Sequence, residues 1–277
     1  MRLAVRLAEQ AAPRWLEARA FRAWCRPQKR ASRWGALAES SRRFTFSGSE
    51  ELAAWEWNAV GPRPTALLVH GWSGNAGQMS SFVEPLVARG FHVVAVDLPA
   101  HGESHGDFTT LVSMADAVVS LGRRLFPEVI IAHSLGATAT TLALDAGLSP
   151  RRVALLAPPA QMPPYLRHFA EQVGLSATLQ ARLLARIEAL TQRKVDELEL
   201  ARLAPDLGRV EALVVHDEGD DEVPLSAAQD VVQQWPGARL VVTHGLGHHG
   251  IRRDAAVVGE VVRFVGGEVA ASPRRAA

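Results

Sequence analysis

The sequence predicts an α/β fold with a mostly parallel central sheet, helices on both of its faces and a small helical cap. Three observations predict it: short apolar runs recur along the chain, helical stretches separate them, and one long interval has helices but no strand. Parallel strands buried on both faces are nearly continuous apolar runs, and helices connect them. A length of 277 residues with 48% hydrophobic residues allows a sizeable core.

Residues 1–43 are expected to form a basic, amphipathic helical arm. Leu3, Leu7, Ala11 and Trp15 recur at four-residue spacing, and Pro13 interrupts this pattern. Up to residue 45 the chain carries eleven basic residues against three acidic ones, whereas the net charge of the whole chain is only +1. Two interpretations stay open: a helix packed on the flank of the domain, or an arm that contacts a membrane surface or a protein partner.

The core of the fold is expected to span 44–157 and 209–266. It begins with antiparallel strands at 43–46 and 53–57, joined by a turn at Ser47-Gly48-Ser49. Six further apolar runs are predicted strands: 66–70, 92–96, 129–132, 153–156, 212–215 and 239–242. Helices are expected between and after them, at about 78–89, 109–125, 135–145, 226–234 and 251–265.

Two segments are expected to lie outside this core. Residues 158–208 hold helical patterns only, which predicts a cap inserted over the carboxyl edge of the sheet, where functional loops gather. Residues 267–277 are expected to be a disordered tail.

Other properties of the sequence narrow the compartment and the partners. Cys25 is the only cysteine, so no intrachain disulfide can form, and no window approaches the roughly 18 apolar residues of a membrane-spanning helix. The charge at Arg6 does not fit the apolar centre of a signal peptide. We therefore predict a cytoplasmic protein, and a net charge of +1 argues against a nucleic-acid partner.

The strongest signal of a functional site is a serine where a predicted strand runs into a predicted helix, in Ala132-His133-Ser134-Leu135-Gly136. Small residues two positions before and after Ser134 let the helix pass close to the strand and hold the hydroxyl clear of the backbone. Outside that context, Ser134 would be an ordinary helix N-cap. The segment resembles the nucleophile elbow of the α/β-hydrolase fold family of esterase- and lipase-like serine hydrolases, with Ala132 replacing the usual glycine.

The resemblance covers about residues 44–265 and includes further loops at the ends of predicted strands. His70-Gly71-Trp72 stands where the family has its oxyanion-hole loop, which implies that the backbone N–H groups of Trp72 and Leu135 bind the oxyanion. The segment from Asp97 to Ser104 resembles a loop for which we expect a structural role. Its acidic and histidine residues lack the spacing of a metal site.

The family order Ser…Asp…His implies that Asp220 is the catalytic acid and His248 the general base. Asp220 lies in an acidic run whose spacing does not match an EF-hand calcium loop. Four neighbours remain alternatives: Asp217 and Asp221 for the acid, and His244 and His249 for the base.

A serine nucleophile predicts an acyl-enzyme that water hydrolyses, with no cofactor and no metal. Because no Arg or Lys lies within a motif, we expect a neutral carboxylic ester or thioester with a short to medium acyl chain. Four side chains are candidates for substrate binding, although each of them could simply pack the cap onto the sheet: Met79, Phe82, Met162 and Tyr165. An acyltransferase or peptidase with the same triad, and a non-catalytic small-molecule receptor, are the alternative functions.

Overall fold

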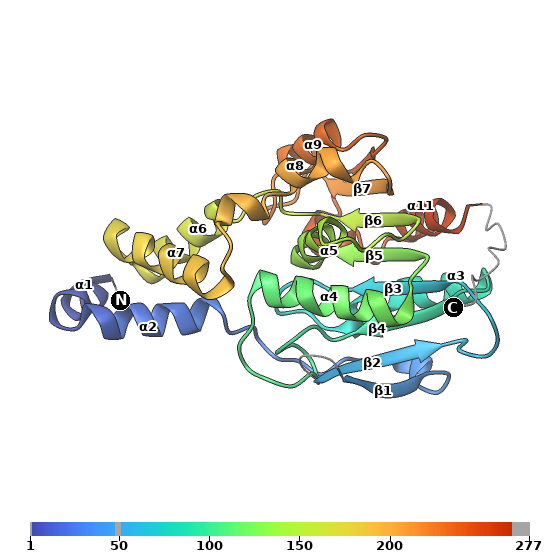
Figure 1. Ribbon diagram of the computed structural model, residues 1–277, viewed down its shortest axis with the longest axis horizontal. Helices are drawn as coiled ribbons and strands as arrows, with labels where there is room; N and C mark the ends of the chain where they lie inside the picture. The colour runs from blue at the N-terminus through green and yellow to red at the C-terminus, as the bar shows by residue number, and fades with distance from the viewer. Residues whose placement is uncertain (1, 48–50, 268–277) are drawn as a thin grey trace.

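The structure is a computed structural model that describes residues 2–47 and 51–267 (Figure 1). Its described strands form one eight-stranded sheet in the order β1-β2-β4-β3-β5-β6-β7-β8. β2 pairs antiparallel with both β1 and β4, and every other pairing is parallel. The strands are β1 Arg42–Ser47, β2 Glu51–Trp57, β3 Thr65–Val69, β4 His92–Val96, β5 Val129–His133, β6 Arg152–Leu156, β7 Glu211–Asp217 and β8 Arg239–Thr243.

Helices cover both faces of this sheet (Figure 1). The α-helices are α1 Arg2–Ala11, α2 Pro13–Trp24, α3 Val83–Ala88, α4 Leu111–Leu125, α5 Leu135–Asp145, α6 Pro163–Val173, α7 Ala177–Thr191, α8 Leu200–Leu203, α9 Leu225–Gln234, α10 Gly247–Gly250 and α11 Ala255–Gly266. Short 3-10 helices are η1 Gly35–Ala38, η2 Ala76–Phe82, η3 Val195–Leu198 and η4 Ala204–Leu207. The predicted fold class is confirmed.

Alternation along each strand divides the interior into two apolar cores. In β3, Leu67 and Val69 pack into the core under α4, α5 and α9, while Ala66 and Leu68 pack into the core under η2, α3 and α11. Successive side chains of a strand point to opposite faces, so a central strand covered on both sides must be apolar throughout. All four of these side chains are fully buried.

Residues 158–208, for which a cap insertion was predicted, lie between β6 and β7. This segment holds α6, α7, η3, α8 and η4 and no strand. Residues 48 and 49 of the predicted turn, and 268–277 of the predicted tail, lie outside the described residues.

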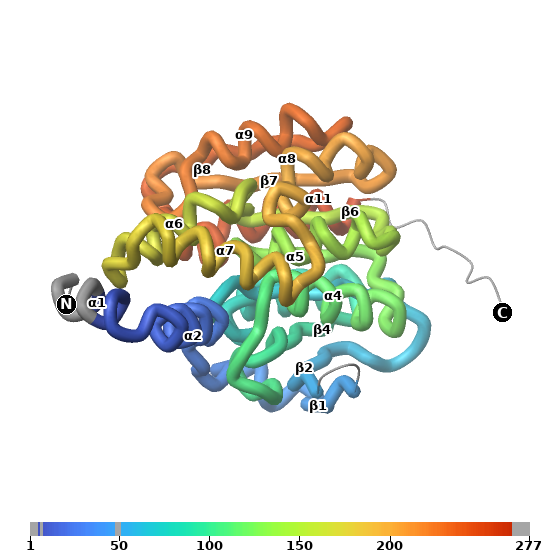
Figure 2. Tube along the Cα trace, turned by 60° about the vertical axis from the view of Figure 1, so that its left-hand side comes forward, coloured from blue at the N-terminus to red at the C-terminus, as the bar shows by residue number. Residues whose placement is uncertain are grey.

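The amino-terminal arm packs against the cap helices (Figure 2). α1 ends at Ala11 and α2 begins at Pro13, which is favoured as a first helical residue because its missing N–H needs no partner there. Phe21 and Cys25 share a small apolar cluster with Leu166 and Leu183 of α6 and α7. The buried side of α2 therefore faces the cap.

None of the described helices is long and apolar enough to cross a membrane.

Candidate functional site

Ser134 lies on the turn between β5 and α5, in a backbone conformation that non-glycine residues rarely adopt. Its φ is 51° and its ψ is −129°, a strain of about 1–3 kcal/mol that surrounding structure must offset. The turn is tight: a Cβ at Gly136 would lie 2.1 Å from the carbonyl oxygen of His70. The helix can therefore leave the strand at this angle only because residue 136 has no side chain.

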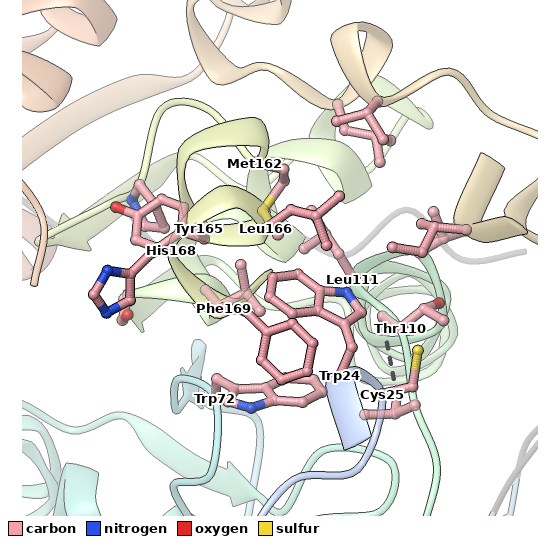
Figure 3. Close-up of a pocket in the computed structure, with 18 of the residues that line it drawn as sticks. Trp24, Cys25, Trp72, Thr110, Leu111, Met162, Tyr165, Leu166, His168 and Phe169 are labelled. Atoms are coloured by element: carbon pink, nitrogen blue, oxygen red, sulfur yellow. Dashed lines mark hydrogen bonds between the residues drawn. The ribbon is translucent and has the colours of Figure 1, made fainter. Parts of the chain in front are cut away.

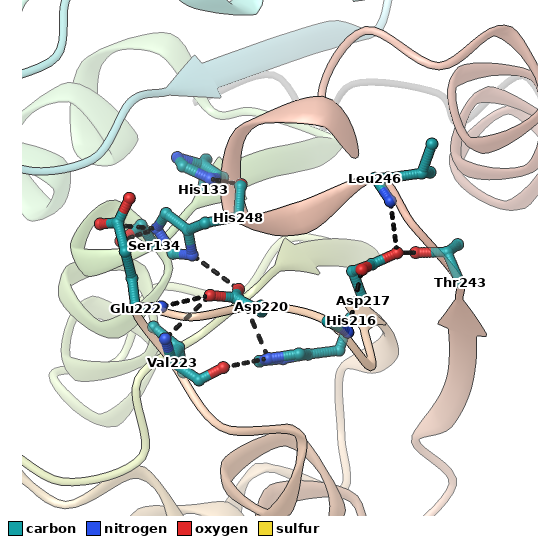
Figure 4. A network of polar contacts seen from close by, with 11 residues as sticks. His133, Ser134, His216, Asp217, Asp220, Glu222, Val223, Thr243, Leu246 and His248 are labelled. Carbon is teal, nitrogen blue, oxygen red and sulfur yellow. Dashed lines mark hydrogen bonds and ion pairs between the residues drawn. The ribbon is translucent and has the colours of Figure 1, made fainter.

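His248 and Asp220 complete a hydrogen-bonded series with Ser134 (Figure 4). His248 Nε2 lies 2.9 Å from Ser134 Oγ, and His248 Nδ1 lies 2.7 Å from Asp220 Oδ2. The geometry is that of a hydroxyl donating to Nε2 while Nδ1–H donates to the carboxylate. Both the imidazole and the carboxylate are buried, so water competes little with these bonds.

The backbone of its own loop fixes the carboxylate of Asp220. Its Oδ1 accepts hydrogen bonds from the N–H groups of Glu222 and Val223, both at 2.9 Å. Burial alone would raise the pKa of Asp220, but the hydrogen bonds from His248, Val223 and Glu222 outweigh it and lower the pKa below its ordinary value. Asp220 is therefore an ionised acceptor that cannot turn away from the imidazole.

Asp217, the buried alternative acid, joins two loops. It accepts hydrogen bonds from the Thr243 hydroxyl, at 2.8 Å, and from the N–H groups of Leu246 and Gly219, both at 3.0 Å. These bonds hold the loop after β8, and thus α10 with its histidines, against the end of β7. Asp221, by contrast, is exposed.

The two alternative bases face other partners. His244 Nδ1 lies 2.6 Å from Glu218 Oε1, and His249 Nε2 lies 3.1 Å from Glu222 Oε1. Both imidazoles are largely exposed, and neither is brought to Ser134 by a hydrogen bond in the described structure. His248 is the histidine that contacts the serine.

The His70–Trp72 loop lies directly against the serine. A Cβ at Gly71 would be 2.8 Å from Ser134 Cβ, so only glycine allows this approach. His70 holds the loop: its Nδ1–H donates to the Gly71 carbonyl at 2.7 Å, and its Nε2 accepts from Leu98 N–H at 3.0 Å. Burial lowers the pKa of His70 to about 4, so the ring is neutral near pH 7 and can both donate and accept.

His133 is a residue of this site for which no role was predicted. Its Nε2–H donates to the backbone carbonyl of His248 at 2.9 Å, which ties the loop of His248 to the residue before the serine. Burial lowers the pKa of His133 well below its usual value and keeps the ring neutral. Its place at the end of β5, directly before Ser134, was the available signal, because the carboxyl end of a strand faces the loops of the site.

A largely apolar pocket of about 410 Å³ opens beside Ser134 (Figure 3). Met162 and Tyr165 line it, as expected, and the cap contributes Leu166 and Phe169 as well. Its described lining includes no Lys and no Arg, and Glu222 is its one carboxylate.

Met79 and Phe82 do not line this pocket, which corrects their predicted role in substrate binding. Both belong to η2, are fully buried and pack in the core on the other face of the sheet, beside Trp34 and Trp55. The short helix after the Gly71 loop turns these side chains away from the serine and into that core.

The amino-terminal arm also lines the pocket, which the sequence did not reveal. Trp24 and Cys25, at the end of α2, face the cavity from the side opposite α6. The Trp24 ring packs edge-on against Phe169, with ring centroids 5.2 Å apart. Burial raises the pKa of Cys25 to about 12, so its thiol stays protonated and acts as an apolar wall.

The loop from Asp97 to Ser104 is held by hydrogen bonds within the fold. Asp97 accepts from the N–H groups of Ala76 and Glu103 and from the hydroxyl of Ser32. Its carboxylate therefore joins three segments that are distant in sequence.

Comparison with known proteins finds a family and named relatives that match the chain. A model of the Alpha/beta hydrolase family matches residues 66–260. A pimeloyl-[acyl-carrier protein] methyl ester esterase of Xanthomonas campestris pv. campestris is 33% identical over 110 residues, and the match spans 40% of this chain and only 42% of that protein. A protein of the same name from Nitrosomonas europaea is 27% identical over 241 residues, which cover 71% of this chain and 93% of the relative.

Solved structures agree on the fold. An esterase of Pyrococcus furiosus superposes with a TM-score of 0.65 over 86% of this chain and 98% of its own, at 19% sequence identity.

Proposed function

Because the chain belongs to the alpha/beta hydrolase family, we propose that it is a serine hydrolase of neutral carboxylic esters or thioesters. The observation that carries the proposal is the unbroken hydrogen-bonded series from Ser134 through His248 to Asp220. Curated relatives that are named as methyl ester esterases support the same reaction class.

The geometry gives each group a step in the reaction. As Ser134 Oγ attacks the carbonyl carbon, its proton passes to His248 Nε2, and Asp220 stabilises the imidazolium that forms. The N–H groups of Trp72 and Leu135 are proposed to bind the oxyanion. The imidazolium then protonates the leaving alcohol or thiol, and water attacks the acyl-enzyme with His248 again accepting the proton.

The pocket favours an uncharged acyl chain. Its walls are mostly apolar, Glu222 is among the described residues that line it, and neither Lys nor Arg is. An acyl chain that ends in a free carboxylate would lose hydration and face like charge. We therefore propose that the acyl group is a neutral chain of short to medium length. Hydrophobic contact with residues such as Trp24 and Phe169 would hold it in the pocket.

A panel of esters tests both the reaction and the acyl preference. The protein should hydrolyse p-nitrophenyl esters of short to medium chains, and a fluorophosphonate probe should label Ser134. The dimethyl ester of a linear dicarboxylic acid should be hydrolysed at least about tenfold faster than its half-ester, which corresponds to ~1.4 kcal/mol of discrimination. Glu222→Gln should narrow that ratio.

Other results of the panel would contradict this function. Turnover that requires an added alcohol or amine acceptor would indicate an acyltransferase, and cleavage of amides alone would indicate a peptidase. Ligand-induced stabilisation without turnover or probe labelling would indicate a receptor.

For residues 1–43 we propose contact with an anionic membrane surface through the outer side of α2. Arg14 and Arg19 are exposed there, and Trp15, which is 58% exposed, lies with its ring 5.7 Å from the Arg19 guanidinium. An aromatic side chain flanked by cations is typical of helices that lie on anionic lipid.

Vesicle co-sedimentation tests this contact. Because deleting the arm would remove Trp24 and Cys25 from the pocket, substitutions are the better probe. Changing both Arg14 and Arg19 to Gln should weaken binding to phosphatidylglycerol vesicles by about tenfold or more, since each cation near an anionic leaflet contributes about 1 kcal/mol. Arg63→Gln, which removes an exposed charge before β3, should leave binding unchanged. Equal binding to neutral phosphatidylcholine vesicles, or none to either, would contradict the proposal and favour a protein partner.

A further inference from the structure

Two further histidines, which the proposed hydrolysis does not use, lie beside the proposed base His248. Within the described residues, His133, His248 and His249 each offer a nitrogen, and these atoms lie within 4.8 Å of one another. The ring centroids of His133 and His248 are 4.8 Å apart, and those of His248 and His249 are 5.2 Å apart. Imidazole is the side chain that zinc and copper prefer, so this cluster has the chemistry of a transition-metal site.

The hydrogen bonds of His248 prepare its Nε2 for a metal. Because Nδ1–H donates to Asp220, at 2.7 Å, Nε2 carries the lone pair, and the Ser134 hydroxyl occupies it at 2.9 Å. A carboxylate that orients an imidazole through its far N–H is the usual arrangement behind metal-ligating histidines, since it fixes the tautomer and raises the basicity of the ligand. Ser134 and a metal ion would therefore compete for the same lone pair.

Glu222 lies between the two neighbouring imidazoles. Its Oε1 is 3.1 Å from His249 Nε2, and its Oε2 is 3.8 Å from His248 Nε2. Two ligand atoms of a tetrahedral zinc ion, with bonds of about 2.0–2.2 Å, are about 3.3–3.6 Å apart. The side chains of His249 and Glu222 are 62% and 53% exposed, so solvent leaves both free to turn toward an ion held by the three imidazoles.

His133 has one ring nitrogen that no hydrogen bond of the described residues uses. Its Nε2–H donates to the His248 carbonyl, so its lone pair is on Nδ1, which is buried without a hydrogen-bond partner in the described structure. A buried nitrogen without a partner costs free energy, and a cation beside it would offset that cost.

We propose that His133, His248 and His249, closed by Glu222, form an inhibitory site for zinc. The ion takes the lone pair of His248 Nε2, so the hydroxyl of Ser134 keeps its proton and cannot become a nucleophile. Inhibition is reversible, because a chelator returns the imidazole to the serine. The proposal rests on the proposed function only for its effect on activity, since binding of zinc itself does not require turnover.

Two matched variants test the site. His249→Gln removes one ligand outside the proposed reaction, and His244→Gln removes an equally exposed imidazole that also pairs with a glutamate, Glu218, at 2.6 Å. Wild-type protein should bind one zinc ion by titration calorimetry and lose ester hydrolysis as the ion binds. His249→Gln should weaken binding and inhibition by at least about tenfold, because even outer partners of a metal site contribute 10–100-fold to affinity. His244→Gln should match wild type.

The same titration on Ser134→Ala keeps the test independent of catalysis. Without the competing hydroxyl, that variant should bind zinc at least as tightly as wild type, even if no ester is found to be a substrate. Zinc affinities that are equal in wild type and His249→Gln, or weakened to the same extent by His244→Gln, would overturn the site. Inhibition by Mg²⁺ at the same concentration would also overturn it, because Mg²⁺ prefers oxygen ligands.

Discussion

Ser134→Ala is expected to lower kcat for ester hydrolysis by about 10⁴- to 10⁶-fold, because no other group can form the acyl-enzyme. The proposed oxyanion donors, the N–H groups of Trp72 and Leu135, and the apolar pocket would remain in place, so a small residual rate over the uncatalysed reaction is expected. The effect on stability should be small. Alanine keeps the strained φ of 51° and loses only the hydrogen bond to His248, which contributes about 0.5–1.5 kcal/mol.

Three measurements separate this result from misfolding. Steady-state kinetics on a p-nitrophenyl ester give kcat, thermal unfolding gives the melting temperature, and mass spectrometry after fluorophosphonate treatment locates the label. Ser40→Ala is a suitable control, because its hydroxyl is exposed and bonds only its own turn, at the Leu37 carbonyl. A Ser134→Ala protein that still hydrolyses the ester at near wild-type rate, or still takes the label, would contradict the assigned nucleophile.

The fold was predictable because burial on both faces of a sheet constrains every residue of a strand. Leu67, Leu68 and Val69 are all fully buried, although they alternate between the two cores. Such a strand has to be an uninterrupted apolar run, and the runs in this sequence recur at the lengths of strands. Helix positions followed from the spacing between these runs, as with α5, whose observed limits at Leu135 and Asp145 agree with the prediction.

The turn around Ser134 was predictable for a steric reason that the sequence also records. Because a Cβ at Gly136 would meet the His70 carbonyl at 2.1 Å, and one at Gly71 would meet Ser134 Cβ at 2.8 Å, these glycines have no substitute. A close approach of two backbone segments therefore requires glycine at a given position and can be predicted from the sequence. The direction of a larger side chain does not restrict the residue type in this way and cannot be predicted from it.

Two features of the pocket could not be predicted from the sequence: the direction of some side chains, and a contact between segments that are distant in the chain. Met79 and Phe82 follow the Gly71 loop, as a pocket residue might, but η2 turns both into the core on the other face. Trp24 reaches the pocket because the arm packs on α7, and it contacts Phe169 far along the chain. No periodic pattern encodes that pairing. It depends on how two amphipathic helices meet after the sheet has formed.

Asp220→Asn is the second change with a very large expected effect, a fall in kcat of about 10⁴-fold with KM nearly unchanged, as when the corresponding aspartate of a serine protease is replaced. The reason is specific to the contacts of this carboxylate. Oδ1 accepts two backbone N–H bonds, from Glu222 and Val223, so the asparagine must place its carbonyl oxygen there. Its NH₂ group then faces His248 Nδ1 and selects the tautomer with the proton on Nε2.

In that tautomer Nε2 of His248 carries a proton and has no lone pair to accept the proton of Ser134. His248 can then no longer act as the base, although its position hardly changes. Asp217→Asn separates this effect from general damage to the loop. Its carboxylate accepts from Thr243 and Leu246 rather than from the imidazole, so that variant should lose stability and retain most of its kcat. Exposed Asp221→Asn should change neither quantity. Steady-state kinetics and thermal unfolding of the three variants, measured in parallel, test this prediction. If kcat fell as far in Asp217→Asn or Asp221→Asn as in Asp220→Asn, the hydrogen bond between Asp220 and His248 would not be the interaction that orients the imidazole.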